Sequence, residues 1–196
     1  MRIGVLGGTF DPPHYGHLAL AKAAIESLEL DEVLFLPAFR NPLKKDRRAT
    51  PGDKRLEMVR LLIKDQPNMT VSDADLTRRG PSYALQTMME FAMARPAEYW
   101  FLVGADALHD LPQWKQPFRL VKLCRIGAVN RGLKEASVVS SRLPEELRPF
   151  IDEVPMTPVG ASASDIRDRI ARNQPTSSWM PDTVRAYIEA NHLYRT

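Results

Sequence analysis

The chain has 196 residues, 44% of them hydrophobic and 26% charged, which is typical of one folded domain and excludes a disordered chain. The net charge of +3 favours an anionic partner only weakly. The sequence lacks the stripe of alternating aromatic and basic residues that would indicate nucleic-acid binding. The single cysteine, Cys124, excludes an internal disulfide, and no apolar run is long enough to span a bilayer. We therefore expect a cytoplasmic protein without membrane contact, in which Cys124 is a small buried strand residue.

Short apolar runs alternate with helical patterns along the chain. The apolar runs predict strands at 3–6, 33–37, 69–72, 99–106, 124–131 and, weakly, 154–159. The helical patterns predict helices at about 14–28, about 51–64, from 82 to before Pro96, in a stretch after 106, from about 162, and at 181–194. Alternation of this kind predicts a doubly wound parallel α/β sheet, whose ligands bind beyond the carboxyl ends of the strands.

Three of the predicted helices begin with residues that are typical of N-terminal caps. Thr50 to Asp53 and Ser162 to Asp165 have the pattern of capping boxes, and Ser82 is expected to cap the third helix. No linker interrupts the chain. We predict one domain over residues 1–196, with about 160–196 as a candidate C-terminal helical lobe.

The stretch GVLGGTFDPPHYGHLALA, residues 4–21, carries a glycine-rich turn between the first strand and the first helix. It fits neither G-x-G-x-x-G nor the Walker A pattern, which speaks against a dehydrogenase or a P-loop kinase. Gly7-Gly8 would allow a tight turn close to a ligand, and Asp11-Pro12 would cap a helix whose free N–H groups favour an anion. His14 and His17 are three residues apart on one helical face, with Gly16 between them to avoid crowding the ligand. Histidines that only cap a helix are the alternative.

GTFDPPHYGH (8–17) resembles the signature of the HxGH nucleotidyltransferase superfamily. The companion motif of that superfamily appears at Ser164 to Arg167, preceded by Ser162. The resemblance implies a Rossmann-like nucleotidyltransferase fold and the transfer of a nucleotidyl group from a nucleoside triphosphate. The catalytic residues that it implies are His14, His17 and Arg167. The residues that it implies for ATP binding are Gly8, Thr9, Phe10, His17, Gly104, Asp106, Ser164, Ile166 and Arg167.

The chemistry of these groups suits such a transfer. His17 would bind the α-phosphate with His14 beside it, and Arg167 would hold the β- and γ-phosphates through its planar fork. A phosphate monoester acceptor is already nucleophilic at neutral pH, so no general base is needed. No carboxylate cluster has metal-ligand spacing, so we expect Mg²⁺ to arrive with ATP rather than in a protein cage.

Within the superfamily the whole chain is similar to the bacterial nicotinate-mononucleotide adenylyltransferases. The similar segments are GGTFDPPHYGHL (7–18), RRGPSYALQT (78–87), FLVGADALHDLPQW (101–114), VNRG (129–132), SDIRDRI (164–170) and MPDTVRAYIEANHLY (180–194). This resemblance implies ATP and nicotinate mononucleotide as substrates. The residues expected to bind the acceptor are Thr9, Lys44, Ser82, Tyr83, Ala84, Trp114 and Arg131.

Several of these residues have an assigned role and an alternative. Trp114 would stack on the pyridine ring, or it is a core tryptophan. Asp106 would accept the ribose hydroxyls, or it only caps a helix. Lys44 or Lys45, in the basic run 44–48, would reach the phosphates, or the run is a solvated loop. The helix that begins at 82–84 would favour a carboxylate over a carboxamide.

Three positions depart from the family pattern, and each removes one polar group. Ala84 replaces a threonine, Leu43 replaces a histidine, and Ala163 replaces a serine. Nicotinamide mononucleotide or another phosphorylated acceptor therefore stays an alternative substrate. A kinase-like phosphoryl transferase and a non-catalytic nucleotide sensor or RNA-binding module are the other classes considered. An assembly of identical chains is also left open by the sequence.

Overall fold

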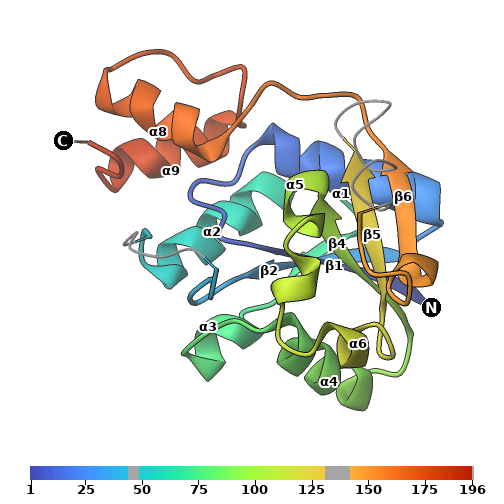
Figure 1. Ribbon diagram of the computed structural model, residues 1–196. Helices are drawn as coiled ribbons and strands as arrows, with labels where there is room; N and C mark the ends of the chain where they lie inside the picture. Colours follow the sequence, from blue (N-terminus) through green and yellow to red (C-terminus); the bar gives the residue numbers. More distant parts are fainter. Residues whose placement is uncertain (44–48, 131–141, 196) are drawn as a thin grey trace.

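The computed structural model describes residues 1–43, 49–130 and 142–195, which form a six-stranded, all-parallel sheet flanked by helices (Figure 1). The strands are β1 (Arg2–Gly8), β2 (Glu32–Pro37), β3 (Met69–Val71), β4 (Glu98–Gly104), β5 (Arg125–Asn130) and β6 (Ile151–Pro155). Their order in the sheet is β3-β2-β1-β4-β5-β6. The direction of winding therefore reverses between β1 and β4, and the crevice beyond the ends of these two strands is where such sheets bind ligands.

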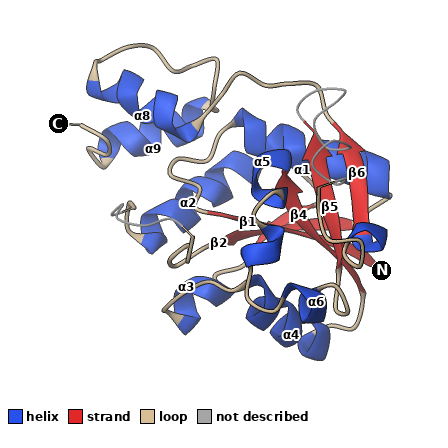
Figure 2. Cartoon of the chain, in the orientation of Figure 1, coloured by secondary structure: helices blue, strands red, loops and turns tan. Residues whose placement is uncertain are grey.

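Helices cover both faces of this sheet (Figure 2). In chain order they are α1 (Tyr15–Leu28), α2 (Gly52–Ile63), α3 (Ala74–Arg78), α4 (Ala84–Ala94), α5 (Ala105–Leu108), α6 (Pro117–Leu120), α8 (Ala163–Ala171) and α9 (Asp182–Ala190), with 3₁₀ turns at η1 (Leu111–Gln113) and η2 (Arg148–Phe150). The doubly wound parallel sheet predicted from the sequence is confirmed.

Two hydrophobic clusters follow from this layering, one on each face of the sheet. The first joins the sheet to α1, α2, α8 and α9, and the second joins it to α4, α5, α6 and η1. The central strands are apolar on both sides because both of their faces are covered. The two C-terminal helices pack beside α1 and α2, at the end of the molecule toward which β1 points (Figure 1).

Several boundaries differ from the predicted ones. The last strand is Ile151–Pro155 rather than 154–159, and α9 ends at Ala190. The five-residue helix α3 lacks a long apolar pattern and was not predicted. Cys124 is buried as expected, but it lies directly before β5 and not within the strand.

Two of the three predicted caps are wrong. The side chain of Thr50 does not cap α2, which has Pro51 at its N-cap position, because the Thr50 side chain is hydrogen-bonded to Tyr194. Ser82 does not cap α4, because its hydroxyl accepts from the N–H of Phe39 (2.9 Å). The Ser162 cap is confirmed, with Oγ accepting from the N–H of Asp165 (3.1 Å).

Candidate active site

The two histidines of the first motif cap the helix α1 reciprocally. His14 is the N-cap residue, with extended backbone, and its Nδ1 accepts from the N–H of Gly16 (3.1 Å). In return His17 Nδ1 accepts from the N–H of His14 (3.2 Å). The two rings lie 3.9 Å apart between centroids, and only 4% of His14 is exposed. One residue pair thus builds both the helix terminus and the histidine cluster.

This reciprocal cap determines which nitrogen carries the proton. Because Nδ1 of each ring accepts a backbone hydrogen bond, the neutral imidazole must carry its proton on Nε2. Both Nε2 atoms are therefore hydrogen-bond donors. Side-chain donors of fixed orientation are what a phosphate that gains negative charge requires.

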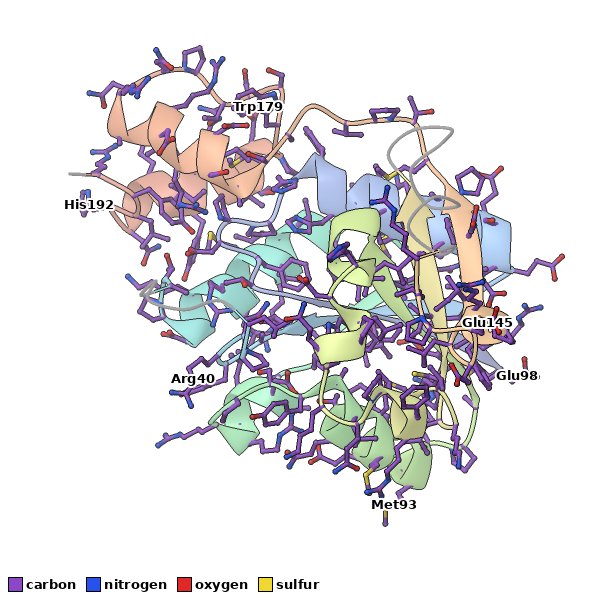
Figure 3. The ribbon with its side chains drawn as sticks, in the orientation of Figure 1. Arg40, Met93, Glu98, Glu145, Trp179 and His192 are labelled. Carbon is purple, nitrogen blue, oxygen red and sulfur yellow. The ribbon has the colours of Figure 1, made fainter. Side chains whose placement is uncertain are left out.

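The prediction that Asp11-Pro12 caps α1, leaving free N–H groups for an anion, is wrong. The helix begins at Tyr15, and the N–H groups of its first turn are already bonded within the protein. His14 and Gly16 donate to the two imidazoles, Tyr15 donates to the Trp179 carbonyl (2.8 Å), and His17 donates to the His14 carbonyl (2.9 Å). Trp179 belongs to the connection between α8 and α9 (Figure 3). The first turn of α1 therefore offers no unbonded N–H group to an anion.

The loop after β1 turns at a residue that the sequence did not indicate. Phe10, not a glycine, adopts the left-handed backbone (φ 50°), and its buried ring contacts that of His17 (4.9 Å between centroids). A Cβ on Gly8 would lie 2.9 Å from the Phe10 ring, so this glycine makes room for the phenylalanine. A Cβ on Gly16 would lie 2.9 Å from the His14 ring, so that glycine protects the cap. The Thr9 hydroxyl is buried and has no hydrogen-bond partner among the described residues.

The structure brings the second motif to the same loop. Arg167, on α8, donates from Nη1 to the carbonyl oxygen of Asp11, although the two residues are 156 positions apart. Ser164 is exposed at the first turn of α8, with its Oγ 3.1 Å from that of Ser162. Ile166 is fully buried in the core, so only its backbone can approach a nucleotide. Arg167 thus lies close to the loop, whereas the side chain of Ile166 supports the packing of α8.

Arg55 is a site-building residue that we missed in the sequence. Only 2% of it is exposed, and it donates three hydrogen bonds to backbone carbonyls: to Thr9 (2.7 Å), to Ala38 (2.8 Å) and to Thr50 (2.7 Å). One guanidinium therefore ties together the loops that follow β1 and β2 and the start of α2. Burial lowers the pKa of Arg55, although Asp11 partly opposes this shift.

The residues predicted to bind the acceptor surround the N-terminus of α4. Ser82 donates its N–H to the Arg40 carbonyl (2.9 Å) and pins this loop to the one that follows β2. The N–H groups of Tyr83, Ala84 and Leu85 have no hydrogen-bond partner in the described part of the chain. Unlike α1, this helix therefore presents donors to a carboxylate.

Aromatic residues lie beside this terminus. Lys115 Nζ lies 4.3 Å from the centroid of the Tyr83 ring, and the neighbouring Trp114 is partly buried with its ring edge-on to Phe101 (5.5 Å between centroids). The structure thus brings Tyr83 and the segment of Trp114 together at the side of the second core cluster. Stacking of Trp114 on a pyridine ring stays a prediction.

A buried polar cluster beside the N-terminus of α4 was also not predicted from the sequence. Asp75 is 4% exposed and accepts hydrogen bonds from the hydroxyl of the fully buried Thr87 (2.7 Å) and from Arg78. Arg78 also donates to the Thr87 hydroxyl (2.9 Å). This cluster joins α3 to α4 and holds both ends of the loop 79–83.

Some predicted residues cannot be placed. Lys44 and Arg131 lie outside the described residues, as does the side chain of Asp106, whose backbone lies in the first turn of α5. Within the described ranges, no three His, Cys, Asp or Glu side chains form a group that could hold a metal ion. No helix in these ranges is long and apolar enough to cross a membrane.

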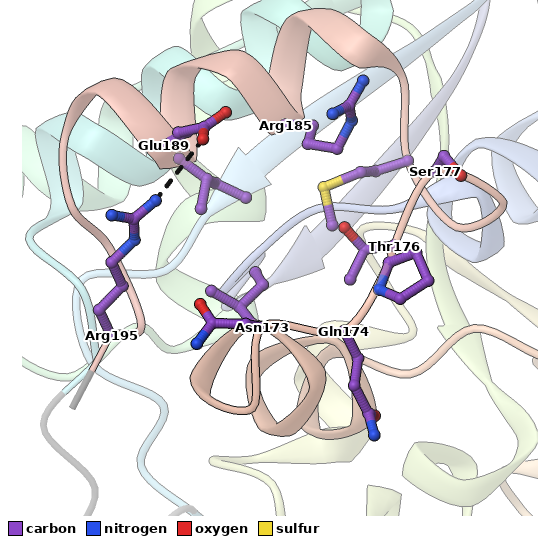
Figure 4. Close-up of a pocket in the computed structure, with 11 residues that line it drawn as sticks. Asn173, Gln174, Thr176, Ser177, Arg185, Glu189 and Arg195 are labelled. Carbon is purple, nitrogen blue, oxygen red and sulfur yellow. Dashed lines mark ion pairs between the residues drawn. The ribbon is translucent and has the colours of Figure 1, made fainter.

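A pocket of about 530 Å³ lies between α8 and α9, away from these groups (Figure 4). It is lined by residues such as Asn173, Thr176 and Arg185, and an ion pair between Arg195 and Glu189 (3.6 Å) lies at one side of it. It contains none of the residues predicted for the site.

The fold and the motif geometry define a class of protein. Residues 5–169 match the family described as cytidylyltransferase-like, and the chain belongs to this family of nucleotidyltransferases. The chain is 41% identical over 198 residues to the "Probable nicotinate-nucleotide adenylyltransferase" of Roseiflexus sp. (strain RS-1), with 98% of each chain covered. A protein of the same printed name from Exiguobacterium sibiricum is 40% identical, with all of both chains covered. Within its class, the chain therefore belongs to the nicotinate-nucleotide adenylyltransferases.

The solved structures agree on the fold. The structure titled "Plasmodium falciparum nicotinic acid mononucleotide adenylyltransferase complexed with APC" superposes with a TM-score of 0.74 at 19% identity. The superposition covers 98% of this chain and 96% of the other. At this identity the likeness concerns the fold.

Proposed function

We propose that this enzyme transfers the adenylyl group of ATP to the phosphate of nicotinate mononucleotide, in the biosynthesis of NAD. An oxygen of the acceptor phosphate forms a bond to the α-phosphorus of ATP, and the bond from that phosphorus to pyrophosphate breaks. The products are nicotinate adenine dinucleotide (deamido-NAD) and pyrophosphate. The names of the relatives, with 40–41% identity over nearly the whole chain, support this choice of substrates.

On the ATP side, we assign charge stabilisation to three side chains. His17 Nε2 donates to the α-phosphate, with His14 as its neighbour, and Arg167 binds the β- and γ-phosphates as pyrophosphate departs. The buried Thr9 hydroxyl, which lacks a partner among the described residues, would donate to a phosphate oxygen of either substrate. Mg²⁺ would arrive bound to ATP and neutralise part of the triphosphate charge.

On the acceptor side, the N-terminus of α4 would bind the nicotinate carboxylate. Its donors are the N–H groups of Tyr83, Ala84 and Leu85, and the dipole of an 11-residue helix favours an anion there. Trp114 would stack on the pyridine ring. The acceptor phosphate has a second pKa of about 6 and is mostly dianionic at neutral pH, so it attacks without a general base.

The reciprocal histidine cap is the single observation that carries the proposal. It leaves two imidazoles with Nε2 donors in one place, beside a loop that Arg167 also reaches. Such an arrangement positions two polyanions and stabilises the leaving group, which is what adenylyl transfer requires.

The direct test is the release of pyrophosphate from ATP and Mg²⁺ in the presence of nicotinate mononucleotide, with the dinucleotide identified by mass spectrometry. Nicotinamide mononucleotide is the matched alternative acceptor, and equal rates with both would contradict the role of the α4 terminus. Release of ADP instead of pyrophosphate would establish a kinase, and ATP binding without turnover would establish a sensor. We also propose a cytoplasmic location, which is supported by the single buried cysteine.

A further inference from the structure

Asp11 connects three parts of the chain that are far apart in sequence. Its carboxylate accepts from the Tyr194 hydroxyl (2.6 Å) and from the N–H of Thr50 (3.4 Å), and its carbonyl accepts from Arg167. Only 6% of Asp11 is exposed. A buried carboxylate needs such partners, so the loss of any one of them disturbs the others.

Tyr194 enters this cluster from the C-terminal end of the chain. It follows α9, adopts the left-handed backbone (φ 62°) and packs against the first core cluster. Burial and the hydrogen bond to Asp11 raise the pKa of Tyr194 far above its ordinary value of 10.0. The phenol therefore stays protonated at neutral pH and can donate to Asp11.

We infer that Tyr194 is a positioning residue for adenylyl transfer, because its hydroxyl fixes Asp11 and, through the Asp11 carbonyl, the guanidinium of Arg167. This inference rests on the proposed function and extends it to a residue 183 positions away from the loop that it holds.

The geometry explains why a single hydroxyl can have this effect. Arg167 and Tyr194 bind opposite ends of one residue, the carbonyl and the carboxylate of Asp11, in the loop that carries Thr9 and Phe10 before the histidines. Without the Tyr194 hydroxyl, the Asp11 carboxylate retains the long hydrogen bond from the Thr50 N–H (3.4 Å) and the electrostatic attraction of Arg55. The carboxylate then turns toward other donors and moves the carbonyl that positions Arg167.

The effect should be much larger on the ATP side of the site than at the N-terminus of α4. The acceptor residues at the N-terminus of α4 are held by a separate set of bonds, in which Ser82 accepts from the N–H of Phe39 and Asp75 accepts from the hydroxyl of Thr87. None of these bonds involves Asp11 or Tyr194. A general loss of structure would instead weaken both substrates.

The test compares Tyr194→Phe with Tyr187→Phe. Tyr187 is a partly buried tyrosine that packs against the same cluster, and its hydroxyl has no hydrogen-bond partner among the described residues. Since the lost bond is to a charged group, we expect Tyr194→Phe to reduce kcat/KM for ATP about 10-fold or more, with a much smaller change in the KM for nicotinate mononucleotide. Tyr187→Phe should behave as the wild type. In an Asp11→Asn background, where the bond is no longer charge-assisted, Tyr194→Phe should cost much less.

Binding of a non-hydrolysable ATP analogue, measured by calorimetry, separates the two proposals. If the wild type binds the analogue but does not convert nicotinate mononucleotide, the proposed function fails, and the analogue affinity of Tyr194→Phe still tests the role of Tyr194. If the wild type is active and Tyr194→Phe matches Tyr187→Phe in both assays, the inference is overturned. Equal losses toward ATP and the acceptor would also overturn it, since they indicate a merely structural tyrosine.

Discussion

Replacement of Arg55 by methionine tests whether one buried cation holds the loops of the nucleotide site together. Methionine fills a similar volume but leaves the carbonyls of Thr9, Ala38 and Thr50 without their donor. Hydrogen bonds to a charged group contribute about 1.5–3 kcal/mol each, but the substitution also removes the cost of burying the guanidinium. We therefore expect a net loss of about 3–5 kcal/mol in the free energy of unfolding, because three carbonyls each lose a donor at about 1–3 kcal/mol and the removed burial cost of the guanidinium offsets part of this loss.

For a chain of this size, a loss of about 3–5 kcal/mol lowers the Tm by roughly 6–20 °C. The assay is urea unfolding, with thermal unfolding as a second probe. Arg60→Met on the same helix is the matched control, because the Arg60 side chain is 55% exposed and its ion pair among the described residues is with Glu57. Arg55→Lys should lie between the two, since an ammonium cannot reach three carbonyls at once. If Arg55→Met is no less stable than Arg60→Met, the argument is refuted.

Four further results are expected. His17→Ala should lower kcat about 10²- to 10³-fold while ATP affinity, measured by calorimetry, changes little; a loss no greater than that of the exposed His192→Ala would indicate a purely structural histidine. Ala84→Thr, which adds a hydroxyl at the α4 terminus, should raise the preference for nicotinate over nicotinamide mononucleotide about 10-fold in kcat/KM, and an unchanged ratio would argue against a carboxylate there. Burial opposes ionisation of Asp152, yet the hydrogen bonds from Arg125 and Trp100 lower the pKa of Asp152 below the ordinary 3.8. The ionised carboxylate therefore stabilises the fold above pH 3.8, and this contribution is lost as the pH falls below that value. Asp152→Asn should flatten the dependence of the unfolding free energy on pH in this acid range. Burial raises the pKa of Cys124 to about 12, so a thiol reagent at pH 8 should modify it only after unfolding, and rapid reaction of the native protein would contradict its burial.

The fold was readable from the sequence because the strands are continuous apolar runs and the helices have separate apolar faces. The caps were harder to predict, because the side chains that look like caps are engaged by distant residues. Asp11 binds Tyr194 rather than the start of α1, and Ser82 binds the backbone of Phe39. Local preference predicts a cap only when nothing else in the tertiary structure competes for the same oxygen.

The histidines and Arg167 were predicted as a group, and the structure brings them to one loop, but their support was not predicted. Arg55 did leave a signal, since it occupies the apolar stripe that continues with Met58, Val59 and Leu62. The Nε2 tautomers of His14 and His17 leave no signal in the sequence, because they depend on which ring nitrogen faces the backbone. The roles of Lys44 and Arg131 stay predictions, since both lie outside the described residues.

The stereochemical course at the α-phosphorus is the most direct test of the central claim, that ATP and the acceptor react with each other in a single in-line step. The measurement uses ATP made chiral at the α-phosphorus by sulfur substitution, with nicotinate mononucleotide as acceptor, and determines the configuration of the dinucleotide. Direct attack predicts inversion, with one pyrophosphate released for each dinucleotide formed. Retention, or label from the adenylyl group attached to the protein during turnover, would contradict the account.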